Sequence, residues 1–230
     1  MSTTTRLNDS PRKMALTAGI FYILTFVSIP TLSLYNTARD PNFIIGTGPD
    51  TNIFIGVILE IIVALTGIGT AVALYPILKR QNGSVALGLV GARILEAATI
   101  FTGAAFLLSI VTLRQTGIGA DGIVTGKTLV ALYDRIFMVG QGLIPAVDDL
   151  LLGYLLYRSG LVPKSLALIG LIGAPILVTG NMSVMFGLIG QKDPSTFLFA
   201  LPVALFEFTL GVLLVVKGFN KSAPLVKDFK

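Results

Sequence analysis

Six charged residues lie in stretches of sequence that are otherwise almost entirely apolar. They are Glu60, Arg93, Glu96, Asp148, Asp149 and Glu207. A charge inside a bilayer costs at least about 2.5–3.5 kcal/mol on insertion scales, so such residues usually face the interior of a helix bundle and have a role. One arginine opposes five carboxyl groups, which cannot all be ionised in a dry, low-dielectric space. A neutral carboxylic acid can donate a proton, as general-acid chemistry and proton-coupled transport both require.

Helical spacing puts several of these carboxyl groups on faces made of small residues. Small residues three or four positions apart share a face with Glu60 (Gly56, Ala64, Gly67), with Asp149 (Ala146, Gly153) and with Glu207 (Ala204, Gly211). Membrane helices place small residues where their backbones approach closely, so these faces are predicted to contact other helices. Arg93 is expected to pair with Glu96 on its own face and with Asp149 at matching depth. Because Asp148 and Asp149 are about 100° apart on a helix, only one is expected to point fully inward.

This pattern yields a set of candidate site residues. We predict that Glu60, Glu96, Asp149 and Glu207 are the proton-transferring groups, and that Arg93, Asp148 and Asn181 are binding groups. Asn181 is expected mainly to form a hydrogen bond between helices. A second interpretation of Arg93 and its partners is a buried ion-pair cluster that sets helix register. Whether Asp134 and Arg135 belong to the site stays open.

The residue types exclude several kinds of chemistry. The chain has no Cys and no His, which excludes disulfides, His/Cys zinc sites, and Cys or Ser–His nucleophile pairs. No metal and no cofactor is expected. Of the 230 residues, 53% are hydrophobic and only 13% charged, with a mean hydropathy of +0.85. A soluble domain averages roughly 25% charged residues, so the composition predicts an integral membrane protein.

The elements that position these residues are six predicted transmembrane helices in an all-α bundle. Each is long enough to span the hydrocarbon core, which takes about 20 apolar residues. They are expected at residues 14–35, 52–78, 84–112, 128–157, 165–190 and 197–216, in one domain over residues 1–220, followed by a short basic tail at 221–230. With the N-terminus inside, eleven Lys and Arg residues fall on the cytoplasmic side and four outside, so both termini are predicted to be cytoplasmic.

The net charge of +5 is explained by this topology and requires no nucleic-acid partner. The expected partners are the lipid bilayer and a lipophilic or small-molecule ligand, with a homodimer among the assemblies considered.

Several segments together resemble a known family. They include Glu60, the segment Arg93-Ile-Leu-Glu96-Ala97, the turn from Leu156 to Lys164 with sequence LYRSGLVPK, and Glu207 followed by Lys217-Gly-Phe219. In order and spacing the chain resembles domain-of-unknown-function family 4386 from about Arg12 to Phe219. The resemblance implies a small multi-pass protein of the bacterial inner membrane, and it supplies no activity.

Three functions fit these residues. The first is an acid–base enzyme, an isomerase, cyclase or lyase without a cofactor, that acts on a lipophilic, isoprenoid-like substrate; Glu60 or Glu207 would be its acid. The second is a proton-coupled carrier or channel for a small solute. The third is a non-catalytic membrane subunit whose polar cluster serves assembly. We rank the first slightly ahead of the second.

Overall fold

A computed structural model describes residues 10–40 and 42–229, and within them the chain forms helices and no strands. The long helices are α1 (Pro11–Thr25), α3 (Thr51–Leu78), α4 (Gly83–Gln115), α5 (Gly122–Ser159), α6 (Lys164–Met185) and α7 (Pro194–Val216). The short ones are η1 (Phe26–Ser28), α2 (Thr31–Leu34), η2 (Gly119–Asp121) and α8 (Pro224–Lys227). The predicted all-α fold is confirmed. Residues 1–9 of the predicted domain, and Lys230 of the predicted tail, lie outside the described residues.

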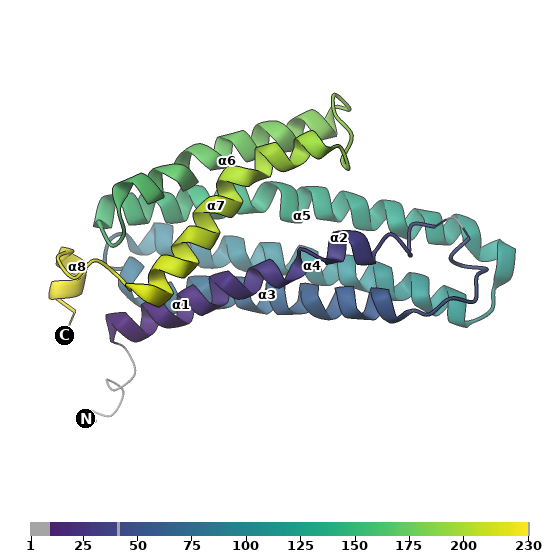
Figure 1. Cartoon of the computed structure of the whole chain (residues 1–230), viewed down its shortest axis with the longest axis horizontal. Coiled ribbons are helices and arrows are strands. Elements are labelled where there is room, and N and C mark those ends of the chain that lie inside the picture. Colours follow the sequence, from purple (N-terminus) through teal and green to yellow (C-terminus); the bar gives the residue numbers. More distant parts are fainter. Residues whose placement is uncertain (1–9, 41, 230) are drawn as a thin grey trace.

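The six long helices form a closed ring. Each packs on the next in the order α1, α3, α4, α5, α6, α7, and α7 packs back on α1. The start of α1 and the helix α8 lie at one end of the bundle, the terminal end, whereas the loop between α6 and α7 lies toward the other, the loop end (Figure 1).

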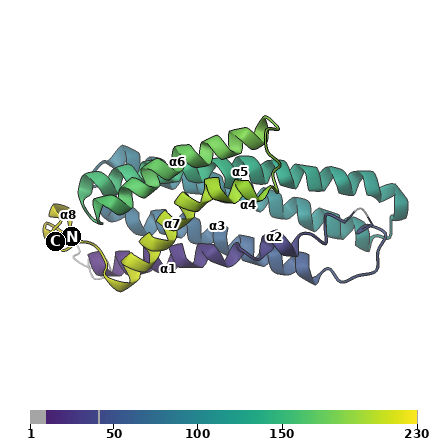
Figure 2. The same ribbon diagram turned by 45° about the horizontal axis from the view of Figure 1, so that its top comes forward.

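Helix α7 crosses the bundle obliquely. It lies beside α1 at the terminal end and beside α6 at its own N-terminus, so it diverges from the first segment toward the loop end (Figures 1 and 2). At the terminal end, Arg12 donates hydrogen bonds from its guanidinium to the carbonyls of Leu214 (3.0 Å) and Val215 (2.7 Å). These carbonyls belong to the last turn of α7, where they have no donor within the helix. Arg12 thereby fastens α1 to α7 where the two helices meet.

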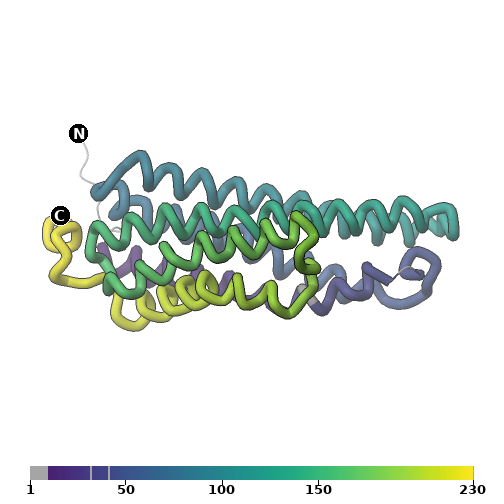
Figure 3. The backbone as a smooth tube through the Cα atoms, turned by 90° about the horizontal axis from the view of Figure 1, so that it is seen from above, coloured from purple at the N-terminus to yellow at the C-terminus, as the bar shows by residue number. Residues whose placement is uncertain are grey.

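Five helices, α3 to α7, are long and apolar enough to cross a membrane, which fits a multi-pass membrane protein. Helices α6 and α7, of 22 and 23 residues, are about 33–35 Å long, close to the thickness of a hydrocarbon core. Helix α5, of 38 residues, is about 57 Å long. The ends of α4 and α5 therefore project beyond α6 and α7 (Figure 3).

The first segment differs from its prediction. The sequence predicts one helix over residues 14–35, but α1 ends at Thr25 and the chain continues through η1 into the short α2. Pro30 has no N–H to donate into a helix. The hydroxyls of Thr25, Ser28 and Thr31 each bond a carbonyl three residues earlier, at 2.7 to 3.2 Å, which competes with regular helical hydrogen bonding. At 15 residues, α1 is not among the five candidate spans.

Two other helix ends also differ from prediction. Helix α5 begins at Gly122 rather than 128, because a turn of 3-10 helix leads directly into it. Helix α6 ends at Met185 rather than 190, because Gly187 takes a left-handed conformation with φ of 72°. Glycine is the residue that most readily takes this conformation after a helix.

Apolar packing closes the bundle on both sides of its polar residues. One cluster of buried residues fills the terminal end and includes Leu74, Leu152 and Leu210, each fully buried. A second cluster lies toward the loop end and includes Ile53 and Leu107. Both ends of the interior are therefore packed with apolar side chains.

A tight contact between α1 and α7 gives a first testable prediction. A Cβ atom on Gly19 would lie 2.8 Å from the carbonyl oxygen of Gly211 and 2.9 Å from the backbone nitrogen of Val215. Since backbone atoms cannot move aside alone, Gly19→Leu should lower the free energy of unfolding by about 1–3 kcal/mol, as overpacking does. The matched control is Gly91→Leu, because a Cβ on Gly91 meets nothing within 4 Å. Thermal melting of both variants in detergent measures the difference, and equal melting temperatures would contradict this close contact.

Candidate functional site

Arg93 of α4 is the centre of a buried ion-pair cluster. Its Nη1 donates to Glu96 Oε2 (2.9 Å), one turn along the same helix, and its Nη2 donates to Glu207 of α7. Its Nε lies 3.5 Å from Asp148 Oδ2 of α5. The ring of Tyr22, from α1, lies under the guanidinium at 5.7 Å from its centroid. Arg93 therefore joins four helices, and each of its nitrogens faces a carboxylate.

Asp149, which follows Asp148 in the chain, forms no ion pair within the described residues. Asp148 and Asp149 are both fully buried, and neither oxygen of Asp149 has a hydrogen-bond partner among the described residues. The expectation that only one of the two aspartates points inward is wrong, because α5 packs between α4 and α6 and both of these faces are covered.

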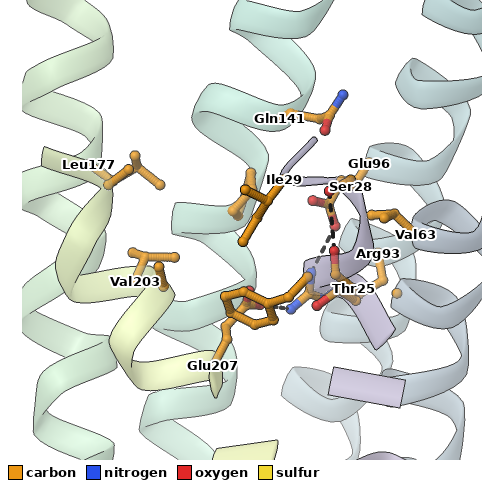
Figure 4. Close-up of a pocket in the computed structure, with 15 residues that line it drawn as sticks. Thr25, Ser28, Ile29, Val63, Arg93, Glu96, Gln141, Leu177, Val203 and Glu207 are labelled. Carbon is orange, nitrogen blue, oxygen red and sulfur yellow. Dashed lines mark hydrogen bonds and ion pairs between the residues drawn. The ribbon is translucent and has the colours of Figure 1, made fainter. Parts of the chain in front are cut away.

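A cavity of about 240 Å³ lies directly against the ion pairs. Arg93, Glu96 and Glu207 line one side of it. In Figure 4, Arg93 and Glu96 of α4 face Glu207 of α7, with the guanidinium between the two carboxyl groups. Apolar side chains form the walls, among them Phe26, Ile29, Val63, Leu177 and Val203. We call this space the Arg93 cavity.

The Arg93 cavity is open at the surface of the bundle rather than enclosed. Residues of η1 and α7 line it, and these are the segments that diverge toward the loop end. Ile29 beside it is 64% exposed, and Leu205 on the neighbouring turn of α7 is 51% exposed. The cavity therefore opens beside aliphatic side chains that the bundle leaves exposed.

Pro145 shapes the wall that α5 contributes. It has no N–H, so the carbonyl of Gln141, four residues earlier, loses its helical donor. Both residues line the Arg93 cavity. The side chain of Gln141 is also a neighbour of the Glu60 carboxyl group, so it lies between the Arg93 cluster and a second polar group.

This second group is centred on Glu60 of α3. The hydroxyl of Tyr133 donates to Glu60 Oε1 at 2.7 Å, and both residues are at most 2% exposed. Tyr35 packs edge-on against Tyr133, with ring centroids 5.4 Å apart. Arg39 pairs with Asp134 (Nη2–Oδ1 2.7 Å) and lies over the ring of Tyr133. Glu60 is therefore held apart from Arg93, in a group of its own nearer the loop end.

The predicted site residues thus fall into separate places. The structure brings Glu96, Asp148 and Glu207 together on Arg93, buries Asp149 next to Asp148 in the chain, and separates Glu60 from them. Asp148, rather than the expected Asp149, is the aspartate that faces Arg93. Asn181 donates to the carbonyl of Gly142 on α5 (2.8 Å), so its predicted hydrogen bond between helices is confirmed. Asp134 joins the Glu60 group through Arg39, whereas Arg135 is exposed beside Met138.

Sequence reasoning missed Tyr22, Tyr35, Tyr133, Arg39 and Gln141. Gln141 carried a signal, because a polar amide in an apolar helix needs partners. The tyrosines carried none, since their rings are compatible with any membrane helix. Over the described residues, no group of three or more acidic side chains is arranged to hold a metal ion.

Comparison with protein families matches residues 17–218 to the family described as "Domain of unknown function (DUF4386)". The match covers most of the chain. The chain belongs to the DUF4386 family. This confirms the resemblance drawn from the segments around Glu60, Arg93, the α5–α6 turn and Glu207. Neither the curated proteins nor the solved structures contain a match.

Proposed function

We propose that this protein is a membrane-embedded acid–base enzyme that acts on a lipophilic substrate in the Arg93 cavity. The observation that carries the proposal is the position of Glu96 and Glu207. Both line a laterally open cavity with apolar walls, and both are tethered to one arginine at its floor. Such a cavity, apolar with a few convergent polar groups, is the usual form of a small-molecule site.

In this proposal Glu207 is the acid and Glu96 the base. Three acids share the single cation Arg93, and in the reactive state a proton is bound to Glu207. Glu207 gives this proton to one carbon of a carbon–carbon double bond, leaving a cation on the neighbouring carbon. Glu96 takes a proton from the carbon on the other side of the cation, and a new double bond forms there. The substrate is isomerised with no change in formula, and water in the open cavity carries the proton from Glu96 back to Glu207, which restores both carboxyl groups.

Arg93 acts as a positioning residue. All three of its nitrogens face carboxylates of the chain, so it has none left for a substrate anion. Its charge favours the ionised form of whichever carboxyl group is the base at that moment.

A deuterium experiment tests this proposal. The full chain is purified, returned to vesicles made from a total bacterial lipid extract, and incubated in D₂O. Mass spectrometry then looks for a lipid that gains deuterium on carbon. Gain with the wild-type protein and with Asp121→Asn, an exposed acid, but not with Glu207→Gln supports the proposal. Equal gain with Glu207→Gln, or no gain in any lipid, contradicts it.

A proton-coupled carrier is the second candidate, and one observation favours it. Polar groups continue beyond the Arg93 cavity through Gln141 to Glu60, Tyr133 and the Arg39–Asp134 pair. At the terminal end, however, the buried apolar cluster leaves no polar path across the bundle. A carrier needs access from both sides, so a pocket with one opening favours the enzyme. In proteoliposomes under a pH gradient, proton flux that Glu96→Gln abolishes would favour the carrier.

We further propose that the segment α1–η1–α2 is a sixth span and that both ends of the chain are cytoplasmic, in a bacterial inner membrane. The distribution of Lys and Arg supports this orientation. Because the chain has no Cys, single cysteines report topology cleanly. Cysteines at Lys13 and Ser222 should react with a membrane-impermeant maleimide only after cells are opened, and a cysteine at Thr47 should react in intact cells. All three residues are exposed. Labelling at position 13 in intact cells would contradict the sixth span.

A further inference from the structure

Two more cavities continue the Arg93 cavity toward the loop end. The middle cavity, of about 280 Å³, shares Gln141, Leu177 and Ala200 with the Arg93 cavity. A third, of about 380 Å³, shares Phe137, Gln191, Thr196 and Phe197 with the middle one. Since Arg39 lines this third space, we call it the Arg39 cavity. The three cavities therefore adjoin one another in a row along α7, and together we call them the groove.

The length of the groove follows from α7, which forms one wall throughout. Thr196 lines the Arg39 cavity and Glu207 lines the Arg93 cavity. These eleven helical steps correspond to about 16 Å. Aromatic and aliphatic side chains dominate the middle cavity, including Phe137, Val184 and Phe199. The groove therefore has a long apolar middle between two polar ends.

At the Arg39 end of the groove, Arg39 and Lys192 have hydrogen-bond donors that no acid of the chain uses. Both acids that line this cavity are already engaged: Asp134 accepts from Arg39, and Asp193 Oδ1 accepts from the backbone N–H of Ser195 (2.8 Å). By contrast, Arg39 uses only its Nη2 on Asp134, and its Nη1 forms no hydrogen bond within the described residues. Lys192 is exposed, and it forms no ion pair with any residue that the structure describes. Glu60 does not line this cavity.

We propose that the occupant of the groove is a single-chain lipid phosphate. Its phosphate lies at Arg39 and Lys192, its chain runs through the middle cavity, and a part of the chain about 16 Å from the phosphate reaches Glu207. Guanidinium and ammonium groups are the side chains that bind phosphate best. This inference rests on the proposed function, because it names the substrate class of the same site.

Binding is measured without any reaction. The chain has no Trp, so circular dichroism follows its melting temperature in a neutral detergent. The probes are hexadecyl phosphate, hexadecanol, butyl phosphate and inorganic phosphate. Hexadecyl phosphate should raise the melting temperature, and the other three should leave it unchanged. An equal rise with hexadecanol, or a rise with inorganic phosphate alone, would overturn the proposal.

Two pairs of variants locate the lipid. Lys192→Gln should weaken binding of hexadecyl phosphate about tenfold, the effect of one charge-assisted hydrogen bond, and Lys13→Gln at the terminal end should not. Ala200→Phe fills the junction of two cavities and should abolish binding, whereas Leu198→Phe, on a residue 65% exposed, should not. If the two members of either pair bind alike, the groove is not the lipid site.

The two proposals fail separately. Binding of hexadecyl phosphate without deuterium gain in any lipid would contradict the enzyme and leave the lipid-phosphate site standing. Glu207-dependent deuterium gain in an uncharged lipid, with no binding of hexadecyl phosphate, would overturn the lipid phosphate and leave the enzyme.

Discussion

Replacing Arg93 with Met is expected to lower the free energy of unfolding by about 3–5 kcal/mol, as removal of one partner from a buried ion pair does. The variant leaves Glu96, Asp148 and Glu207 without their shared cation. The melting temperature and the yield of folded protein in detergent measure the loss.

Two further variants show whether the loss of stability comes from the ion pairs of Arg93 or from replacing any arginine with methionine. Arg135→Met changes an exposed side chain whose only hydrogen bond among the described residues is a 3.8 Å contact with Met138, so it should alter stability by less than about 0.5 kcal/mol. Combining Arg93→Met with Glu96→Gln, Asp148→Asn and Glu207→Gln should recover much of the loss, because the uncompensated carboxylates are removed. An Arg93→Met protein as stable as the wild type would contradict the central role of this arginine.

Glu207→Gln is expected to lower the rate of deuterium transfer to lipid carbon by about 10²–10⁴-fold, the usual contribution of a positioned acid or base. The amide can still accept a hydrogen bond from Arg93, so the fold should be retained and the melting temperature should stay close to that of the wild type. The rate is taken from a time course in D₂O, with protein amounts matched by folded fraction.

Glu60→Gln is the informative comparison for that loss. Glu60 bonds Tyr133 in a separate group and does not line the Arg93 cavity. The change should therefore leave the rate within a few-fold of the wild type if Glu207 is the acid. A larger loss from Glu60→Gln than from Glu207→Gln would reverse the assignment.

Much of the fold could be predicted from hydropathy alone. The ends of α3 and α7 lie within three residues of their predicted positions, because long apolar runs bounded by polar residues determine them. The break after Thr25 could not be predicted as readily. It depends on Pro30 together with three hydroxyl groups that bond back to carbonyls, and each of these residues alone is tolerated in membrane helices.

The sequence predicted which residues form the site better than it predicted how they are placed relative to one another. Charges in apolar segments pointed to Arg93 and to the acids Glu96, Asp148, Asp149 and Glu207, because only an enclosed interior makes such charges tolerable. The separation of Glu60 depends on how far α3 is rotated and shifted against α5, which single-helix periodicity does not specify. The same limit applies to Asp148 and Asp149, since a helix packed on two sides buries two faces.

In the proposed enzyme a lipophilic molecule reaches the carboxyl group of Glu207 through the open side of the bundle. An experimental structure of the full chain in a bilayer of native lipids tests this. We expect an elongated density that enters between η1 and α7 and touches Glu207 and Glu96. A cavity filled by side chains, or holding only water, would contradict it.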